Sequence, residues 1–164
     1  MSKYSVSDEE RALFRQAVNA IKPQRATKQS PNHKAQELYL SDHYHHQPVD
    51  AETVLSYGIH GLDKRRISQL KNGGIAPEAR LDLHGLRIDE ASRKLVEFIE
   101  STKAQQKRCL LIIHGKGGQQ NGRGPVLKNL VYQWLQQIPG ILAFHSAKPK
   151  DGGNGALYVL LKRN

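Results

Sequence analysis

Residues 109–117 read Cys-Leu-Leu-Ile-Ile-His-Gly-Lys-Gly, and they carry the clearest structural pattern in the chain. Five consecutive apolar residues that end at a glycine-rich loop predict a strand buried on both faces of a sheet. Pro125 and the apolar positions after it predict that the loop leads into a helix. A strand, a glycine-rich loop and a helix in this order are typical of an α/β domain.

The elements on both sides of this stretch complete a βαβαββ order. Upstream, residues 81–84 alternate as a short strand, and residues 89–107 place apolar side chains on one helical face. Downstream, residues 141–147 and 156–162 predict two strands around the glycine-rich turn 151–155. We expect a two-layer α/β sandwich with a four-stranded mixed sheet, whose first strands are parallel and whose last turn permits a hairpin.

The N-terminal half is less regular. Residues 1–22 predict an amphipathic helix, and residues 23–60, rich in polar residues and proline, predict a flexible linker. Residues 61–77 predict a short helical lead-in, and the folded domain is expected over residues 78–164.

The charge of the chain favours a polyanionic partner. The 164 residues include 25 basic and 15 acidic side chains, which gives a net charge of +10. Residues 81–164 alone hold 13 basic and 6 acidic side chains, so the excess lies in the half expected to fold. Nucleic acid is the commonest polyanionic partner, and improved solubility is the alternative explanation.

Several classes of protein are excluded by composition. Cys109 is the only cysteine, which excludes a disulfide framework and a cysteine-based zinc site. No apolar run is long enough to span a membrane, and the N-terminus lacks the apolar region of a secretory signal. We therefore expect a cytoplasmic protein without a membrane partner.

Asp82 and His84 are the first candidate site residues. They lie two residues apart on the first strand, so both side chains are expected on the face opposite Leu81 and Leu83. The carboxylate could orient the imidazole for proton transfer. A polar strand face open to water is the alternative.

The composition of the loop after the buried strand favours binding of an anion. Gly115 and Gly117 let the backbone approach a phosphate, and the following helix offers free N–H groups at its start. Lys116, Arg123 and Lys128 add positive charge. The loop matches neither a P-loop nor a dinucleotide fingerprint, so no nucleotide cofactor is indicated. A flexible strand–helix connection is the alternative.

Parallel first strands would bring both sets of residues to one edge of the sheet. We expect a phosphodiester-cleaving site with Asp82, His84, His114 and Lys116 as its catalytic residues. One imidazole would take a proton from the attacking oxygen, while the lysine and the backbone N–H groups stabilise negative charge. Arg87 is expected to contact nucleic acid, together with Gly115, Gly117, Arg123 and Lys128. No set of metal ligands is predicted.

These motifs resemble those of the Smr (small MutS-related) domain family. Residues 81–86 resemble its Leu-Asp-Leu-His-Gly signature, residues 113–117 its second motif, and residues 152–156 its late Gly-Gly-x-Gly turn. The resemblance covers residues 78–164, roughly half of the chain. The N-terminal helix and linker are similar to those of stand-alone bacterial Smr proteins, particularly the SmrA type.

The resemblance implies a fold similar to the C-terminal domain of a bacterial translation initiation factor. It also implies nuclease activity, because family members nick DNA or cleave RNA, and some act on mRNA at stalled ribosomes. The family's functional positions correspond to Asp82, His84 and residues 114–117, and both motifs are intact in this sequence.

Two functions stay open at this point. The first is an endonuclease with weak sequence selectivity, since no aromatic cluster marks a base-stacking platform. The alternative is a non-catalytic module that binds nucleic acid or a ribosome, with the N-terminal helix as its docking element. DNA and RNA are both open as substrates. No tightly bound cofactor is expected, and Mg²⁺ enters only if DNA is the substrate, because water must then attack.

Overall fold

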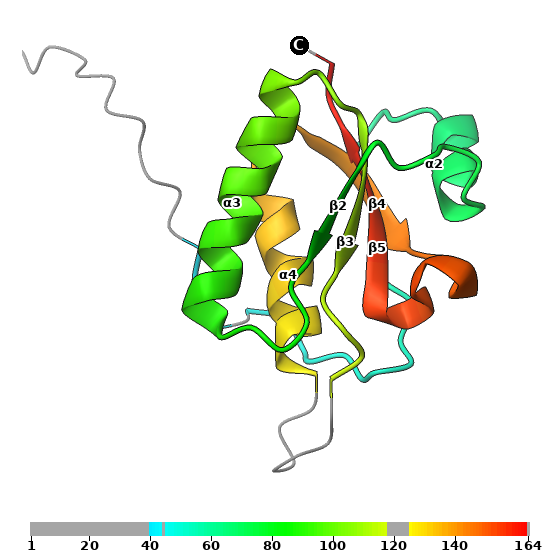
Figure 1. Cartoon of the computed structure of the whole chain (residues 1–164). Coiled ribbons are helices and arrows are strands. Elements are labelled where there is room, and N and C mark those ends of the chain that lie inside the picture. Colours follow the sequence, from blue (N-terminus) through cyan, green and yellow to red (C-terminus); the bar gives the residue numbers. More distant parts are fainter. Residues whose placement is uncertain (1–39, 44, 118–124, 164) are drawn as a thin grey trace, which may run out of the picture. The chain divides into compact units, whose positions relative to one another are not determined.

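The computed structural model describes residues 40–43, 45–117 and 125–163, which form a mixed sheet with helices on both faces (Figure 1). The sheet has five strands in the spatial order β1-β4-β5-β3-β2. The strands are β1 (Ser56–Gly58), β2 (Ala79–Asp82), β3 (Cys109–Ile113), β4 (Ile141–Ser146) and β5 (Ala156–Leu161). The helices are α2 (Lys64–Lys71), α3 (Ile88–Ala104) and α4 (Val126–Gln137), and the 3-10 turns η2 (Pro149–Asp151) and η3 (Gly153–Gly155) join β4 to β5.

The expected α/β class is confirmed, and the sheet has one strand more than the four predicted. β2 and β3 are parallel, as their crossover helix requires. β5 lies between β3 and β4 and is antiparallel to both, so the last two strands form the hairpin that the glycine-rich turn permits. The additional strand, β1, is antiparallel to β4. Its three residues are too few to show an alternating pattern in the sequence.

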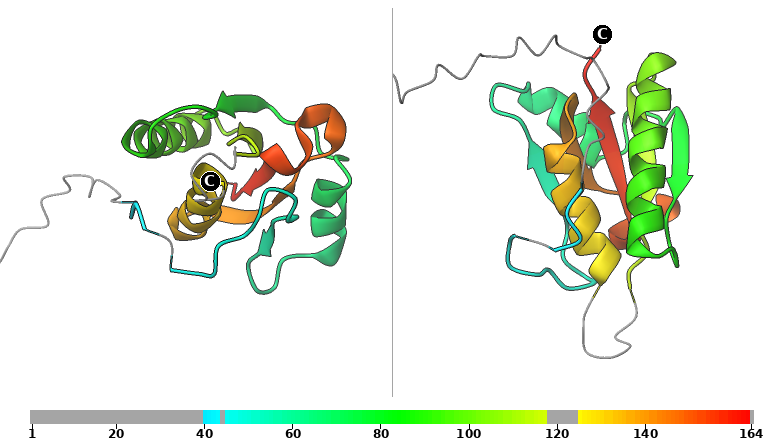
Figure 2. Two further views of the ribbon diagram at one scale, coloured as in Figure 1. Left: turned by 90° about the horizontal axis from the view of Figure 1, so that it is seen from below. Right: turned by 90° about the vertical axis from the view of Figure 1, so that its left-hand side faces the viewer.

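Helices α3 and α4 cover one face of the sheet, and α2 covers part of the other (Figure 2). On the first face, Leu110 and Ile112 of β3 belong to the main core. On the second face, Leu70 of α2 packs with Cys109 and Leu111 in a smaller core. β3 is therefore apolar on both faces, as predicted, and α2 adds a short third layer to the expected two-layer sandwich.

The linker predicted over residues 23–60 is wrong for its described part. Residues 40–43 and 45–55, which we call the strap, pack along α4 instead of extending into solvent. Leu40 and Leu55, at the two ends of the strap, are buried in the main core. The contacts that hold the strap come from residues 80 and 88 positions further along the chain, so the local composition could not reveal them.

Buried polar side chains of α4 hold the strap backbone. The indole N–H of Trp134 donates to the carbonyl oxygen of Ser41 (2.7 Å). The side-chain amide of Asn129 accepts from the Val49 N–H (2.7 Å) and donates to the Val49 carbonyl oxygen (3.0 Å). The amide of Gln133 makes the same pair of contacts with the strap backbone. These contacts imitate the pairing of a neighbouring strand and satisfy buried polar groups.

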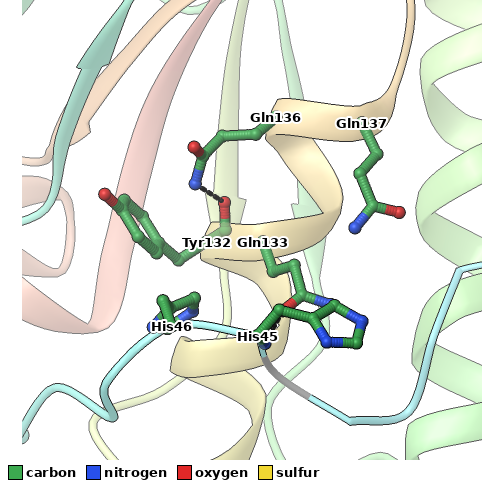
Figure 3. Close-up of a pocket in the computed structure, with 6 residues that line it drawn as sticks. All are labelled: His45, His46, Tyr132, Gln133, Gln136 and Gln137. Atoms are coloured by element: carbon green, nitrogen blue, oxygen red, sulfur yellow. Dashed lines mark hydrogen bonds between the residues drawn. The ribbon is translucent and has the colours of Figure 1, made fainter.

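Figure 3 shows the strap histidines His45 and His46 lying against α4, next to Tyr132 and Gln133. The imidazole of His46 packs edge-on against the Tyr132 ring, with 5.0 Å between ring centroids. The backbone N–H of His45 donates to Gln133 Oε1 (2.6 Å). This part of the strap therefore contributes packing as well as hydrogen bonds.

The predicted helices are present with small shifts at their ends. α4 begins at Val126, and Pro125 occupies the N-cap instead of the first helical position. Within the described ranges, no helix is both long and apolar enough to cross a bilayer. The amphipathic helix predicted over residues 1–22 lies outside the described residues.

Candidate active site

β2 ends at Asp82, and the chain then turns so that His84 folds back onto the Asp82 carboxylate. Asp82 Oδ1 accepts hydrogen bonds from the His84 backbone N–H (3.1 Å) and from the ring Nδ1 (2.6 Å). Leu83, between them, is fully buried in the main core, which directs the two polar side chains outward. The structure therefore brings Asp82 and His84 together, although the strand ends before His84.

Asp82 is held in its ionised form. Partial burial raises the pKa of Asp82, but the hydrogen bonds from the ring and the backbone N–H of His84 together outweigh burial and bring the pKa below its usual value. A carboxylate only accepts hydrogen bonds, so the neutral His84 ring carries its proton on Nδ1. Nε2 then keeps its lone pair, and with the His84 side chain 69% exposed this nitrogen is free to meet a substrate.

Gly115 and Gly117 shape the loop that follows β3. Both have positive φ angles, +78° and +75°, which residues with a side chain rarely adopt. A Cβ at Gly117 would lie 2.6 Å from the Cα of Pro125, so the loop closes directly onto the start of α4. A Cβ at Gly115 would lie 3.3 Å from the Cβ of His84. The loop therefore lies against His84, as the parallel pairing of β2 and β3 predicts.

Lys116 lies on this loop with its side chain exposed. Its Nζ is 3.8 Å from Glu52 Oε1. No described residue accepts a hydrogen bond from its backbone N–H. The loop also packs tightly on η3, since a Cβ at Gly155 would lie 3.2 Å from the Lys116 nitrogen. An ammonium group and a backbone N–H on one residue are two donors suited to a phosphate. A surface pocket beside Lys116 is lined by Lys116, Ala147, Pro149, Gly152, Gly153 and Asn154.

His114 is not exposed at this site. Only 3% of its surface is accessible, and its Nδ1–H donates to the carbonyl oxygen of Gly115 (2.7 Å). Burial lowers the pKa of His114 to about 4, with a smaller contribution from the charge of Lys128, so the ring is neutral near pH 7. Its Nε2 is buried without a hydrogen-bond partner among the described residues. The structure thus gives His114 a role in holding the loop, and the sequence alone could not show its burial.

Lys128 was predicted to contact nucleic acid, but the structure buries it. It is 1% exposed, and its Nζ donates to the carbonyl oxygens of Ala51 (2.8 Å) and Thr53 (2.5 Å) in the strap. Burial lowers the pKa of Lys128, although Asp50 and Glu52 oppose this effect. Its ammonium group therefore holds the strap against the first turn of α4.

Of the two arginines predicted to contact nucleic acid, only one lies within the described residues. Arg87 is exposed at the N-cap of α3, just beyond the turn that carries His84, and its side chain makes no capping hydrogen bond. Arg123 lies outside the described residues.

Sequence reasoning missed two residues beside Lys116. Glu52 lies in the strap, where only a linker was expected, and its carboxylate faces the Lys116 ammonium. The side-chain amide of Asn154 donates to the Glu52 carbonyl oxygen (2.9 Å) and so fastens the strap to η3. Asn154 lies in the glycine-rich turn and was therefore detectable, whereas nothing in the local sequence singles out Glu52.

The charged groups of the site are few. Within the described part of the chain, no three His, Cys, Asp or Glu side chains are grouped to hold a metal ion. Asp82 and Glu52 are the nearby carboxylates, and each already has a partner in His84 and Lys116. The arrangement offers one imidazole for proton transfer and one ammonium for a developing negative charge.

Comparisons with known proteins identify the family of this domain. Residues 81–162 match the family model of the Smr domain. Ribosome rescue factor SmrB of Pectobacterium carotovorum is 32% identical, over 98% of this chain and 94% of that protein. The protein of the same name from Shewanella putrefaciens is 34% identical, over 92% of this chain and 89% of its own length.

A solved structure supports the same assignment. YdaL, a stand-alone small MutS-related protein from Escherichia coli, is similar with a TM-score of 0.65 and 29% sequence identity, over 76% of this chain and 95% of that chain. The sequence motifs, the fold and the relatives agree on the family, but these relatives carry the name SmrB and not the SmrA type that the N-terminal segment resembles. This chain belongs to the Smr domain family.

Proposed function

We propose that this protein is an endoribonuclease that acts on RNA at the ribosome. The observation that carries the proposal is the Asp82–His84 pair, in which a carboxylate 2.6 Å from Nδ1 fixes an exposed imidazole next to a glycine-rich loop. The relatives named ribosome rescue factor favour RNA over DNA and the ribosome as partner. A ribosomal partner would place the protein in the cytoplasm.

The proposed reaction begins at His84. Nε2 takes the proton from a ribose 2′-OH, and the oxygen attacks the adjacent phosphorus. The new O2′–P bond replaces the P–O5′ bond, so the products are a 2′,3′-cyclic phosphate and a 5′-OH that takes its proton from solvent. Lys116 and its backbone N–H stabilise the negative charge on the phosphorus oxygens during transfer. Asp82 stabilises the imidazolium that forms on His84.

Glu52 has a defined part in this proposal. In the absence of substrate its carboxylate is the counterion of Lys116, at a distance of 3.8 Å. Both side chains are more than half exposed, so the pair is weak and a phosphate can replace the carboxylate. Substrate binding would thus release Lys116 for the phosphate.

The proposed RNA reaction uses the 2′-OH as nucleophile and calls for no tightly bound cofactor. DNA lacks this group, and water would have to attack in its place. A divalent ion such as Mg²⁺ would then be needed, with Asp82 as one of its ligands. Metal dependence therefore separates the two substrates in an experiment.

A second candidate function is a non-catalytic ribosome- or nucleic-acid-binding module. The net charge of +10 favours it, because a basic surface binds RNA whether or not it cleaves. The names of the relatives describe ribosome rescue and specify no reaction. The two candidates differ in whether the His84 imidazole is needed: a nuclease would lose cleavage without it, whereas a binding module has no cleavage to lose.

The test is a cleavage assay with purified protein on single-stranded RNA and on supercoiled plasmid, each in EDTA and in Mg²⁺. We expect cleavage of RNA in EDTA, and a loss of at least about 100-fold in His84→Ala with RNA affinity retained. His43→Ala is the matched control, because His43 forms an exposed pair with Asp42 (2.5 Å) on the strap. The control should cleave like the unmodified protein.

Other outcomes of this assay are equally informative. Plasmid nicking that needs Mg²⁺ and His84 would replace RNA by DNA as the substrate. Unchanged cleavage in His84→Ala would refute the catalytic assignment. Binding without any cleavage, on naked RNA and on ribosome-bound RNA, would favour the non-catalytic module.

A further inference from the structure

Four lysines lie between the candidate active site and the end of α2. Lys116 borders a surface pocket whose other wall is the β4–β5 turn, including Pro149 and Asn154. Lys148 and Lys150 flank Pro149 on that turn. We call Lys116, Lys150, Lys148 and Lys71 the lysine row.

The turn is in contact with the end of α2. A Cβ at Gly73 would lie 3.5 Å from Cγ of Lys148 and 3.2 Å from the hydroxyl of Tyr158, so the residues just after α2 touch the turn. Lys71 is exposed in the last turn of α2, two residues before this contact. The row therefore follows segments that contact one another: the loop after β3 and the turn border one pocket, and the turn contacts the residues after α2.

The positive charge of the row is poorly compensated. Asp151 is the only acidic residue of the turn, and its carboxylate accepts a hydrogen bond from the buried Tyr158 hydroxyl. In the described ranges, no carboxylate lies within ion-pair distance of Lys71, Lys148 or Lys150. Cations without protein partners attract a polyanion and release its counterions on binding.

We propose that the nucleic-acid strand cleaved at His84 continues over the pocket and along Lys150 and Lys148 to Lys71. This inference rests on the proposed function, because it assigns a path to the strand of that site. None of the described residues that line the pocket is aromatic, which favours contacts with phosphates over stacking on bases. Binding along it is independent of sequence and strengthens with strand length.

The test compares long and short strands that cannot be cleaved. The probes are a labelled 2′-O-methyl oligouridylate, which lacks the attacking hydroxyl, and the corresponding trinucleotide. Fluorescence anisotropy at several salt concentrations gives the affinity and the number of phosphate contacts. We expect the Lys148→Ala/Lys150→Ala variant to bind the long strand at least about 5-fold more weakly, with a salt slope smaller by about 1.4, at about 0.7 for each lost phosphate contact. Affinity for the trinucleotide should stay unchanged.

A matched control removes two exposed cations elsewhere. Lys162 and Arg163 follow β5 at the end opposite to the turn (Figure 1), so Lys162→Ala/Arg163→Ala changes the net charge equally. The proposal is overturned if this control lowers the salt slope as much as the Lys148→Ala/Lys150→Ala variant does. An unchanged salt slope in the Lys148→Ala/Lys150→Ala variant overturns the proposal as well.

A second variant tests whether weaker binding could be caused by misfolding. Lys148 is half-buried against Gly73, whereas Lys71 and Lys150 are both exposed. Lys71→Ala/Lys150→Ala should therefore fold normally and show the same loss of slope. Since binding is measured without cleavage, a protein that cuts no RNA but shows these losses would refute the proposed reaction and leave the lysine row in place.

Discussion

The Asp82 carboxylate serves His84 in two ways, by fixing the position of the ring and by stabilising its charged form. Asp82→Asn keeps an oxygen that can accept from Nδ1 but removes the charge. The imidazolium formed during proton transfer would then lack its counterion. We therefore predict that Asp82→Asn slows single-turnover RNA cleavage by at least about 100-fold without weakening RNA binding.

The control for this prediction is Asp42→Asn, because Asp42 is the carboxylate of the second exposed Asp–His pair. Asp42→Asn should leave the cleavage rate unchanged. If Asp82→Asn cleaves as fast as the unmodified protein, Asp82 has no role in the reaction.

At the scale of elements, the strap and α4 form one unit. The buried ammonium of Lys128 donates to two strap carbonyl oxygens, and Lys128→Ala leaves both without a donor. We predict that this variant lowers the free energy of unfolding by about 2 kcal/mol, measured by urea denaturation. Lys128→Met, which keeps most of the volume, should recover only the packing part of the loss.

The same variant separates two roles for Lys128. If Lys128 bound a phosphate, its substitution would reduce the salt slope of RNA binding and have little effect on stability. If Lys128 is buried and holds the strap, its substitution would lower stability and have little effect on the salt slope. A reduced slope in a stable Lys128→Ala protein would therefore contradict the structure.

At the scale of the whole molecule, the buried ring of His114 links stability to pH. Its pKa is about 4 in the folded protein and near 6.5 in the unfolded chain, where burial is absent. Between these values the unfolded chain binds more protons, so stability falls as the pH is lowered from about 6.5 to 4. We predict a decrease in the free energy of unfolding of up to about 3 kcal/mol over this window.

Urea denaturation at several pH values measures this effect. His114→Gln removes the titrating group and should flatten the profile between pH 6.5 and 4, whatever its effect on stability at pH 7. A variant with the same slope as the unmodified protein would show that other groups cause the loss.

Elements with a local pattern could be predicted from the amino-acid sequence alone. The apolar run of β3 predicted a strand buried on both faces, and its neighbours predicted the helices and a turn that permits a hairpin. The pairing of β2 and β3 then followed from the crossover rule, which brought His84 to the loop of Lys116. The elements depend on residues close together in the chain and the pairing depends on their order, so periodicity, turn chemistry and the crossover rule suffice to predict these features.

Which polar side chains are exposed could not be predicted in the same way, because exposure depends on tertiary contacts. Lys128 is held by carbonyl groups 75 and 77 residues away in the chain, and His114 is covered by the packing of the domain. Glu52 reaches Lys116 because the strap follows α4. A sequence pattern records the chemistry of a side chain, but burial depends on contacts between distant segments, which form only when the chain folds.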